Sequence, residues 1–172
     1  TGEFKLWQKT GKGKFKYIDG ATYTGNFLNN QMHGKGIYIW SDGREYNGDW
    51  RYNKIEGEGV FKWPDGRRYI GHYKNDKKDG YGIFEWPNGK KYKGFWKNGK
   101  KCGFGKLMTR NRRKYGMWTK DDQVNWFKNE EEAFDILEYK GLRPEAEHLD
   151  ALLDASKKDV ENSEMDLVVA AT

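Results

Sequence analysis

The residues best suited to acid–base or nucleophilic chemistry are few and widely separated. The three histidines are His33, His72 and His148, and Cys102 is the single cysteine of the 172-residue chain. A catalytic site needs a nucleophile beside a base, a paired acid and base, a metal cluster or a phosphate-binding loop. None of these arrangements can be assembled from the spacing of these residues. We therefore expect a protein that is not an enzyme and that uses no metal and no cofactor.

Gly-x-Gly is the other pattern with a chemical interpretation, because glycine-rich loops can cradle phosphate groups. The five pairs begin at Gly11, Gly34, Gly57, Gly80 and Gly103. None extends to Gly-x-Gly-x-x-Gly, and no Gly-Lys-Ser/Thr follows. The residues that precede the five pairs are Thr10, His33, Glu56, Asp79 and Cys102. Because these residues differ so much in chemistry, we predict that they lie at the edges of loops and do not form a reactive site. The glycines themselves are predicted to be structural.

Composition narrows the environment of the protein. A single cysteine allows no intrachain disulfide and favours a reducing, cytoplasmic compartment. The sequence contains no run of about 18 apolar residues, no secretory signal and no Asn-x-Ser/Thr glycosylation site. We therefore expect neither a membrane span nor secretion.

A 23-residue period organises the first two thirds of the chain. Its most regular members are Tyr23, Tyr46, Tyr69 and Tyr92. Each tyrosine is followed two residues later by glycine and four residues later by an aromatic residue, as in Tyr46, Gly48 and Trp50. Residues two apart share one face of a strand. The first strand of each unit therefore presents an aromatic ring, a glycine and a second ring on the same side.

A second strand is predicted downstream in each unit. After Gly57-x-Gly59 come Phe61 and Trp63 on the glycine face, while Val60 points to the other side. The dipeptides Asp19-Gly20, Asp42-Gly43, Asp65-Gly66 and Asn88-Gly89 then give a strong hairpin signal. Each unit is predicted to be a strand, a polar loop, a second strand and a tight turn.

The unit from Tyr46-Asn47-Gly48-Asp49-Trp50 through Gly57-Glu58-Gly59 to Asp65-Gly66 resembles the MORN-repeat family. The resemblance covers about residues 1–118. It implies a single-layer, twisted antiparallel sheet of tandem β-hairpins, hence a mainly β fold. Because Thr1-Gly2-Glu3-Phe4 matches Thr24-Gly25-Asn26-Phe27, the first of about five units begins in mid-repeat, and we expect the array to be part of a longer one.

The pattern changes after the array. Residues 119–128 are predicted to form a capping strand, and residues 129–172 an acidic helical tail. Asn129 followed by three glutamates is a helix start, and Pro144 suits the first turn of a second helix. The apolar stripe of that second helix would contain Ala146, Leu149, Leu152 and Leu153. The last ten residues are ambiguous between a strand and a frayed tail.

The aromatic face is the first candidate for binding a partner, because one sheet layer cannot bury such a face against itself. The candidate protein-binding residues are Tyr38, Trp40, Tyr46, Phe61, Trp63, Tyr69, Phe84, Trp86 and Tyr92. Aromatic anchors suit the apolar side of an amphipathic helix. The alternative is that these rings form the minimal core of the array. The C-terminal helices could cover the face or dock on a neighbouring subunit, and the sequence does not choose between these arrangements.

The distribution of charge along the chain indicates a second candidate binding surface. Residues 1–128 carry a net charge of +15 and residues 129–172 carry −9. A basic module favours anionic lipid, an acidic protein segment or the chain's own tail. The candidate residues are Lys74, Lys77, Lys78, Lys90, Lys91, Lys93, Lys97, Lys100, Lys101, Arg110, Arg112 and Arg113. Nucleic acid is disfavoured, because sheet packing already explains the aromatic spacing.

The resemblance implies a scaffolding or tethering role rather than a small-molecule substrate. MORN proteins occur in ciliary spoke and cytoskeletal assemblies, at membrane junctions and as accessory modules of lipid kinases and lysine methyltransferases. We therefore expect a scaffold or adaptor in a cytoskeletal or ciliary, axonemal assembly. The alternatives are a peripheral membrane tether for anionic phosphoinositides and the targeting module of a larger enzyme such as a lipid kinase.

Overall fold

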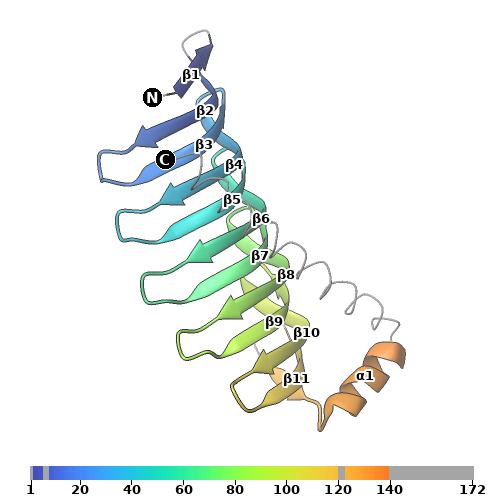
Figure 1. The fold of residues 1–172 in the computed structure, drawn as a ribbon. Coiled ribbons are helices and arrows are strands. Elements are labelled where there is room, and N and C mark those ends of the chain that lie inside the picture. The colour runs from blue at the N-terminus through green and yellow to red at the C-terminus, as the bar shows by residue number, and fades with distance from the viewer. Residues whose placement is uncertain (1, 6–7, 120–122, 140–172) are drawn as a thin grey trace.

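The computed structural model describes residues 2–5, 8–119 and 123–139 of the chain. These residues form one 12-stranded antiparallel sheet in which the spatial order of the strands is their order in the sequence (Figure 1). The strands are β1 (Gly2–Lys5), β2 (Gln8–Lys16), β3 (Thr22–Leu28), β4 (Gln31–Ile39), β5 (Glu45–Arg51), β6 (Lys54–Lys62), β7 (Arg68–Lys74), β8 (Lys77–Glu85), β9 (Lys91–Lys97), β10 (Lys100–Met108), β11 (Arg113–Trp118) and β12 (Val124–Trp126). The predicted single-layer β fold is confirmed.

The register of each hairpin places its glycines opposite one another. In the hairpin of β5 and β6, Tyr46 pairs with Phe61 and Gly48 pairs with Gly59, so all four lie on one face. A bulge follows, because Asp49 alone faces three residues of β6 before Trp50 pairs with Ile55. The Asp49 carboxylate accepts a hydrogen bond from the Glu58 N–H (3.0 Å), which satisfies one donor of the bulge.

Two kinds of turn join the strands at opposite edges of the sheet. At one edge, two-residue turns such as Tyr52-Asn53 have positive φ at both residues (49° and 65°), the type I′ geometry that fits hairpin twist. At the other edge the Gly43 φ is 84°, and the Gly43 N–H donates to Trp40 O (3.0 Å). The Asp-Gly segments, predicted as tight turns, thus form the longer loops, and the predicted polar loops form the tighter turns.

The type I′ turns also tie each repeat to the one before it. The Asn53 N–H donates to Met32 O (3.0 Å), and the Asn53 side-chain oxygen accepts from the Met32 N–H (2.8 Å). Asp76 makes the same two hydrogen bonds with the backbone of Ile55 (3.0 and 2.8 Å). At the equivalent place the last turn carries Gly99, whose N–H donates to Lys78 O (2.9 Å). We call this pair of hydrogen bonds the clamp. Because Gly99 has no side chain, it makes only the backbone bond of the clamp.

The core is a row of tyrosine rings, each seated on a pair of facing glycines. Tyr23, Tyr46, Tyr69 and Tyr92 are 0 % exposed. An aromatic ring from the following repeat packs edge-on against each of them. For example, Tyr73 packs against Tyr46 at a centroid distance of 5.5 Å. The Tyr46 hydroxyl donates to Asp49 O (3.1 Å) and Glu58 O (3.4 Å), and burial raises the Tyr46 pKa above its ordinary value. These contacts supply the core that one sheet layer otherwise lacks.

The C-terminal part continues the sheet and then becomes helical. β12 lies inside the predicted capping segment 119–128 and pairs with β11. The helix α1 (Glu130–Tyr139) begins as predicted at Asn129, whose side-chain oxygen accepts a hydrogen bond from the Glu132 N–H (2.8 Å). The second helix predicted from Pro144 and the ambiguous last ten residues lie outside the described residues.

Candidate protein-binding face

The two sides of the sheet have different chemistry. We call the side of the Tyr46–Gly48–Trp50 series the aromatic face, and the other side the outer face. On the aromatic face, a buried cluster is flanked by partly buried rings, of which the predicted candidates are Tyr38, Trp40, Trp63 and Trp86. We call these four the open rings. They belong to successive second strands or to the loop that follows each of them.

Five of the nine predicted binding residues belong to the interior. Tyr46, Tyr69 and Tyr92 are fully buried, and Phe61 and Phe84 are buried in the same cluster. Their prediction as contact residues is corrected, because a ring sealed under its neighbours has no surface for a partner. The alternative interpretation, that such rings form the core of the array, describes these five. The candidate binding face is therefore confined to the open rings.

The open rings are linked through the buried rings Phe61 and Phe84 into one line along the array. Trp40 contacts Phe61, which contacts Trp63, with centroid distances of 5.2 and 4.4 Å. The line continues through Phe84 to Trp86, with distances of 5.6 and 4.6 Å. The buried rings support the open rings from below, so the open rings are held in fixed positions. A rigid aromatic surface loses little conformational entropy when a partner binds.

A cation lies beside each open tryptophan. The Arg44 guanidinium lies 5.2 Å from the Trp40 ring, and Arg67 lies 5.4 Å from Trp63. In the next repeat, Lys90 Nζ lies 5.1 Å from the Trp86 ring. These distances fall in the range of cation–π attraction. Because the cations come from the Asp-Gly loops, they form a basic rim along that edge of the aromatic face.

Lys78 lies on the aromatic face, although it was predicted to belong to a separate basic surface for an acidic partner. Its Nζ is 4.7 Å from the Trp96 ring, 4.9 Å from Phe84 and 5.3 Å from Tyr69. Burial, followed by the charges of Arg67 and Lys101, lowers the Lys78 pKa to about 8. The signal that was missed is the 23-residue period, which aligns this lysine with Lys9, Met32, Ile55 and Lys101.

The corresponding lysine of the next repeat widens this basic part of the face. Lys101 Nζ lies 5.2 Å from the Tyr92 ring and 5.7 Å from the Trp86 ring. A cavity of about 380 Å³ opens here between Phe84, Trp86, Trp96, Gly99, Lys100 and Lys101. The face therefore offers aromatic walls and ammonium groups together, which suits a ligand with apolar and acidic groups.

Replacing Lys78 by Met, the residue of the equivalent position 32, is expected to stabilise the fold by about 1 kcal/mol at neutral pH. The cause is the removal of a partly buried charge. Because the folded-state pKa of about 8 lies below the ordinary 10.5, the unfolded chain binds more protons between these values. The stability of the natural chain should therefore rise with pH across this window, and Lys78→Met should lack that rise. Urea denaturation at several pH values measures both effects; equal stability and an equal pH slope would contradict them.

The remaining predicted basic residues do not gather on one surface. An exposed set follows the edge of the type I′ turns and consists of Lys74, Lys77, Lys97 and Lys100. A second set lies at or beside the opposite edge and consists of Lys90, Arg110, Arg112 and Arg113. Lys91 and Lys93 lie on the outer face, where Lys91 pairs with Glu85 (2.8 Å). The structure thus divides the predicted acidic-partner site among two edges and both faces.

The residues considered for catalysis are not brought together. His72 Nε2 lies 2.9 Å from the Glu58 carboxylate on the outer face, whereas the His33 ring contacts Tyr52 at a centroid distance of 4.9 Å. Cys102 is half-buried, and burial raises its pKa. Within the described parts of the chain, no group of three or more His, Cys, Asp or Glu side chains could hold a metal ion. The helix of this described part is too short to cross a membrane. His148 lies outside it.

This fold and this face define a tandem β-hairpin repeat protein that presents one aromatic side along a single sheet. The family model described as MORN repeat matches residues 1–22, 23–43, 46–67, 69–91 and 92–111, which is more than half of the chain. The chain belongs to the MORN-repeat family. None of the curated proteins compared with the chain matches it. The MORN repeat is a binding module, and membership is consistent with a protein-binding or membrane-associated repeat protein.

Proposed function

We propose that the chain is a scaffold or adaptor module that binds an amphipathic helix of another protein along the open rings. The observation that carries this proposal is the continuous line from Trp40 through Trp63 to Trp86, in which each ring is supported from below and flanked by a cation. Aromatic and arginine side chains dominate the energetics of protein interfaces. The family resemblance favours a cytoskeletal or ciliary assembly as the setting.

The spacing of the repeats fits a helix that lies across the strands. Neighbouring strands are about 4.8 Å apart, so one two-strand repeat advances about 10 Å. Seven residues of an α-helix advance about 10.5 Å. A partner helix with an apolar residue at every seventh position, and another three or four residues on, therefore meets equivalent open rings in successive repeats.

The cations of the aromatic face predict the charge of the partner helix. Lys78 and Lys101 are one repeat apart and lie close to the open rings Trp63 and Trp86. A carboxylate placed beside each of them would form a charge-assisted contact, and at Lys78 it would offset the cost of a partly buried charge. We therefore expect acidic residues seven positions apart in the partner helix. The partner class is an acidic amphipathic helix with a heptad pattern.

The first test is affinity capture from extract with the 1–172 chain, combined with crosslinking. The variant Trp40→Ala/Trp63→Ala/Trp86→Ala should lose the captured protein, with at least tenfold weaker binding, because interface aromatics are each worth about 2 kcal/mol. The matched control is Ile39→Ala/Tyr52→Ala, which removes exposed side chains away from the open rings. Far-UV circular dichroism and thermal unfolding establish that both variants are folded.

A designed helical peptide tests the partner chemistry directly. The peptide carries leucines in a heptad pattern and glutamate at every seventh position, and its control has lysine in place of glutamate. The glutamate peptide should bind more tightly, and Lys78→Glu/Lys101→Glu should reverse this preference. Capture that is unchanged in the tryptophan variant, together with salt-sensitive binding to acidic lipid vesicles, would overturn the proposal in favour of a membrane tether that uses the basic edge.

A further inference from the structure

The outer face carries a row of side chains that run in register across the sheet. Asn47, Val60, Ile70 and Ile83 are direct cross-strand neighbours on β5 to β8. Ile37 precedes this row on β4, and Lys93, Lys106 and Tyr115 continue it on β9 to β11. We call the whole series the outer row. Its centre is aliphatic, and its C-terminal end is basic.

The centre of the outer row is sealed from water. Val60 is 0 % exposed, and Ile70 and Ile83 are each 3 % exposed, whereas Ile39 on the same face is 42 % exposed. Side chains of a one-layer sheet stand roughly perpendicular to it, so neighbouring strands cover their flanks and leave their tips open. Exposures this low in aliphatic side chains favour a second layer over the centre of the row.

The described helix supplies only the start of such a layer. α1 contacts β11, the Tyr115 hydroxyl donates to the Glu130 carboxylate, and Ala133 is fully buried. α1 begins beside Tyr115, at the basic end of the outer row, and ends at Tyr139. The chain that follows this point is residues 140–172.

We propose that residues 140–172 dock along the outer row as an intramolecular cover. The sequence predicts that this segment contains a helix with the apolar stripe Ala146, Leu149, Leu152 and Leu153. The outer row crosses from β4 to β11, about 34 Å at 4.8 Å per strand. A helix of about 20 residues spans about 30 Å. The segment therefore has the length and the apolar side to cover Val60, Ile70 and Ile83.

The charges of the outer face favour an acidic cover. Lys93 and Lys106 lie directly opposite each other in the register, an arrangement of like charges that destabilises a strand pair. The Nε of Arg68, two residues from Ile70 on the same face, is buried and has no hydrogen-bond partner among the described residues. The acidic residues of the segment include Glu145, Glu147, Asp150 and Asp154. Residues 140–172 hold 8 Asp or Glu and 4 Lys or Arg, so their net charge of −4 has the sign that offsets these cations.

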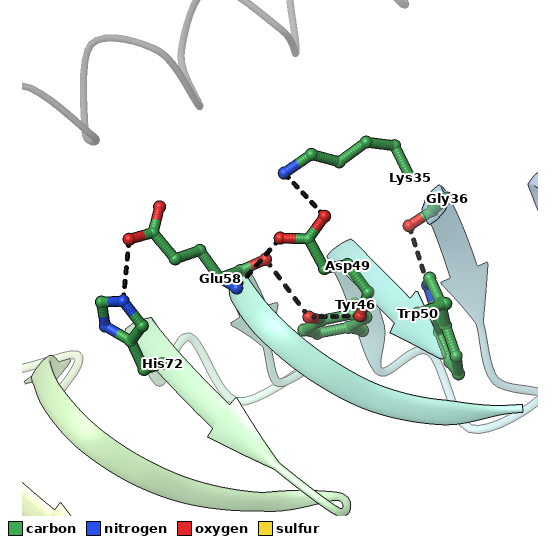
Figure 2. Close-up of polar contacts among 7 residues, drawn as sticks. All are labelled: Lys35, Gly36, Tyr46, Asp49, Trp50, Glu58 and His72. Carbon is green, nitrogen blue, oxygen red and sulfur yellow. Dashed lines mark hydrogen bonds and ion pairs between the residues drawn. The ribbon is translucent and has the colours of Figure 1, made fainter. Parts of the chain in front are cut away.

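Two ion pairs lie on the outer face (Figure 2). Lys35 Nζ lies 2.9 Å from the Asp49 carboxylate, and His72 Nε2 lies 2.9 Å from the Glu58 carboxylate. Both pairs stand on the opposite side of the sheet from the Trp50 and Tyr46 rings. These four groups compensate one another in charge. A cover on the outer face leaves the aromatic face open for a partner.

The test uses the whole chain and measures how far a soluble gadolinium chelate relaxes individual methyl groups in solution NMR. In the natural chain, the methyls of Val60, Ile70 and Ile83 should be protected relative to Ile39. In Leu149→Asp/Leu152→Asp, their relaxation should rise several-fold, to the level of Ile39. The matched control, Ala151→Asp/Ala155→Asp, adds the same charge to the opposite side of the predicted helix and should leave the protection intact.

The Met32 and Ile55 methyls on the aromatic face report whether the array remains folded, and they should not change in either variant. Protection of Ile70 and Ile83 that persists in Leu149→Asp/Leu152→Asp would overturn the proposal. Protection that disappears when the natural chain is diluted would overturn it as well, because it would place a second copy on the outer row. Equal relaxation of Ile70 and Ile39 in the natural chain would show that no cover exists.

Discussion

Substituting Gly59 by Ala is expected to lower the free energy of unfolding by about 3 kcal/mol, the upper range for overpacking a core. A Cβ atom on Gly59 would lie 2.5 Å from the Tyr46 hydroxyl oxygen and 2.6 Å from Cε2 and Cζ of the same ring. The ring cannot withdraw, because it is fully buried beneath Trp50 and Tyr73. Displacing it would also break its hydrogen bonds to the backbone carbonyls of Asp49 and Glu58.

Gly89 provides the matched control for this substitution. Its φ is 80°, and no heavy atom lies within 4 Å of the position that a Cβ would take. Gly89→Ala therefore meets only the backbone preference against left-handed conformations, about 1 kcal/mol. Chemical denaturation of both variants separates the two causes. If Gly59→Ala is no more destabilising than Gly89→Ala, the glycine pair is not a tight seat for Tyr46.

Removing the ring itself should have the larger effect. Tyr46→Ala is expected to cost about 3–5 kcal/mol, because it opens a cavity among Trp50, Phe61 and Tyr73. Tyr46→Phe keeps the ring and loses the hydroxyl, so it should cost only about 1 kcal/mol. Equilibrium unfolding of the pair measures the two contributions. Similar losses in both variants would mean that the hydrogen bonds, rather than the packing of the ring, dominate the energetics.

A third substitution distinguishes buried rings from open ones. Trp63 occupies the aromatic face as Tyr46 does, but it is only partly buried. Trp63→Ala should therefore affect stability less than Tyr46→Ala does, while it weakens the binding of a partner. This contrast follows from the division of the aromatic face into core and open rings.

The fold was predictable because one short pattern repeats with a fixed period. Tyr46, Gly48 and Trp50 at alternate positions require one face of a strand, and the same spacing in four units requires the same hairpin four times. The start of the helix at Asn129 was equally predictable from the sequence, because helix capping depends on local hydrogen bonds. These features are determined by neighbours in the sequence.

The binding face was predicted less completely, because burial depends on what lies above a ring. Tyr46 and Trp63 have the same alternation and the same face, yet the first is sealed by Tyr73 and the second remains partly open. Lys78 was misplaced for the same reason: its charge suggested a separate basic surface, whereas its repeat position is shared with Met32 and Ile55 on the aromatic face. The turns were misassigned because Asp-Gly serves both two-residue and longer hairpin loops.

The clamp that ends at Gly99 makes the array mechanically uneven. The strands of this sheet follow one another in sequence. Tension applied along the array therefore breaks the hydrogen bonds of one strand pair before it reaches the next. At Asn53 and Asp76 the turn side chain adds a hydrogen bond to the backbone bond of the joint between repeats. Gly99 cannot make this bond, so its joint keeps the backbone bond and the contacts of Asp79 with Lys97 and the Asn98 N–H. Under load we expect β9 to β12 to separate first, as a block, from a more strongly fastened array.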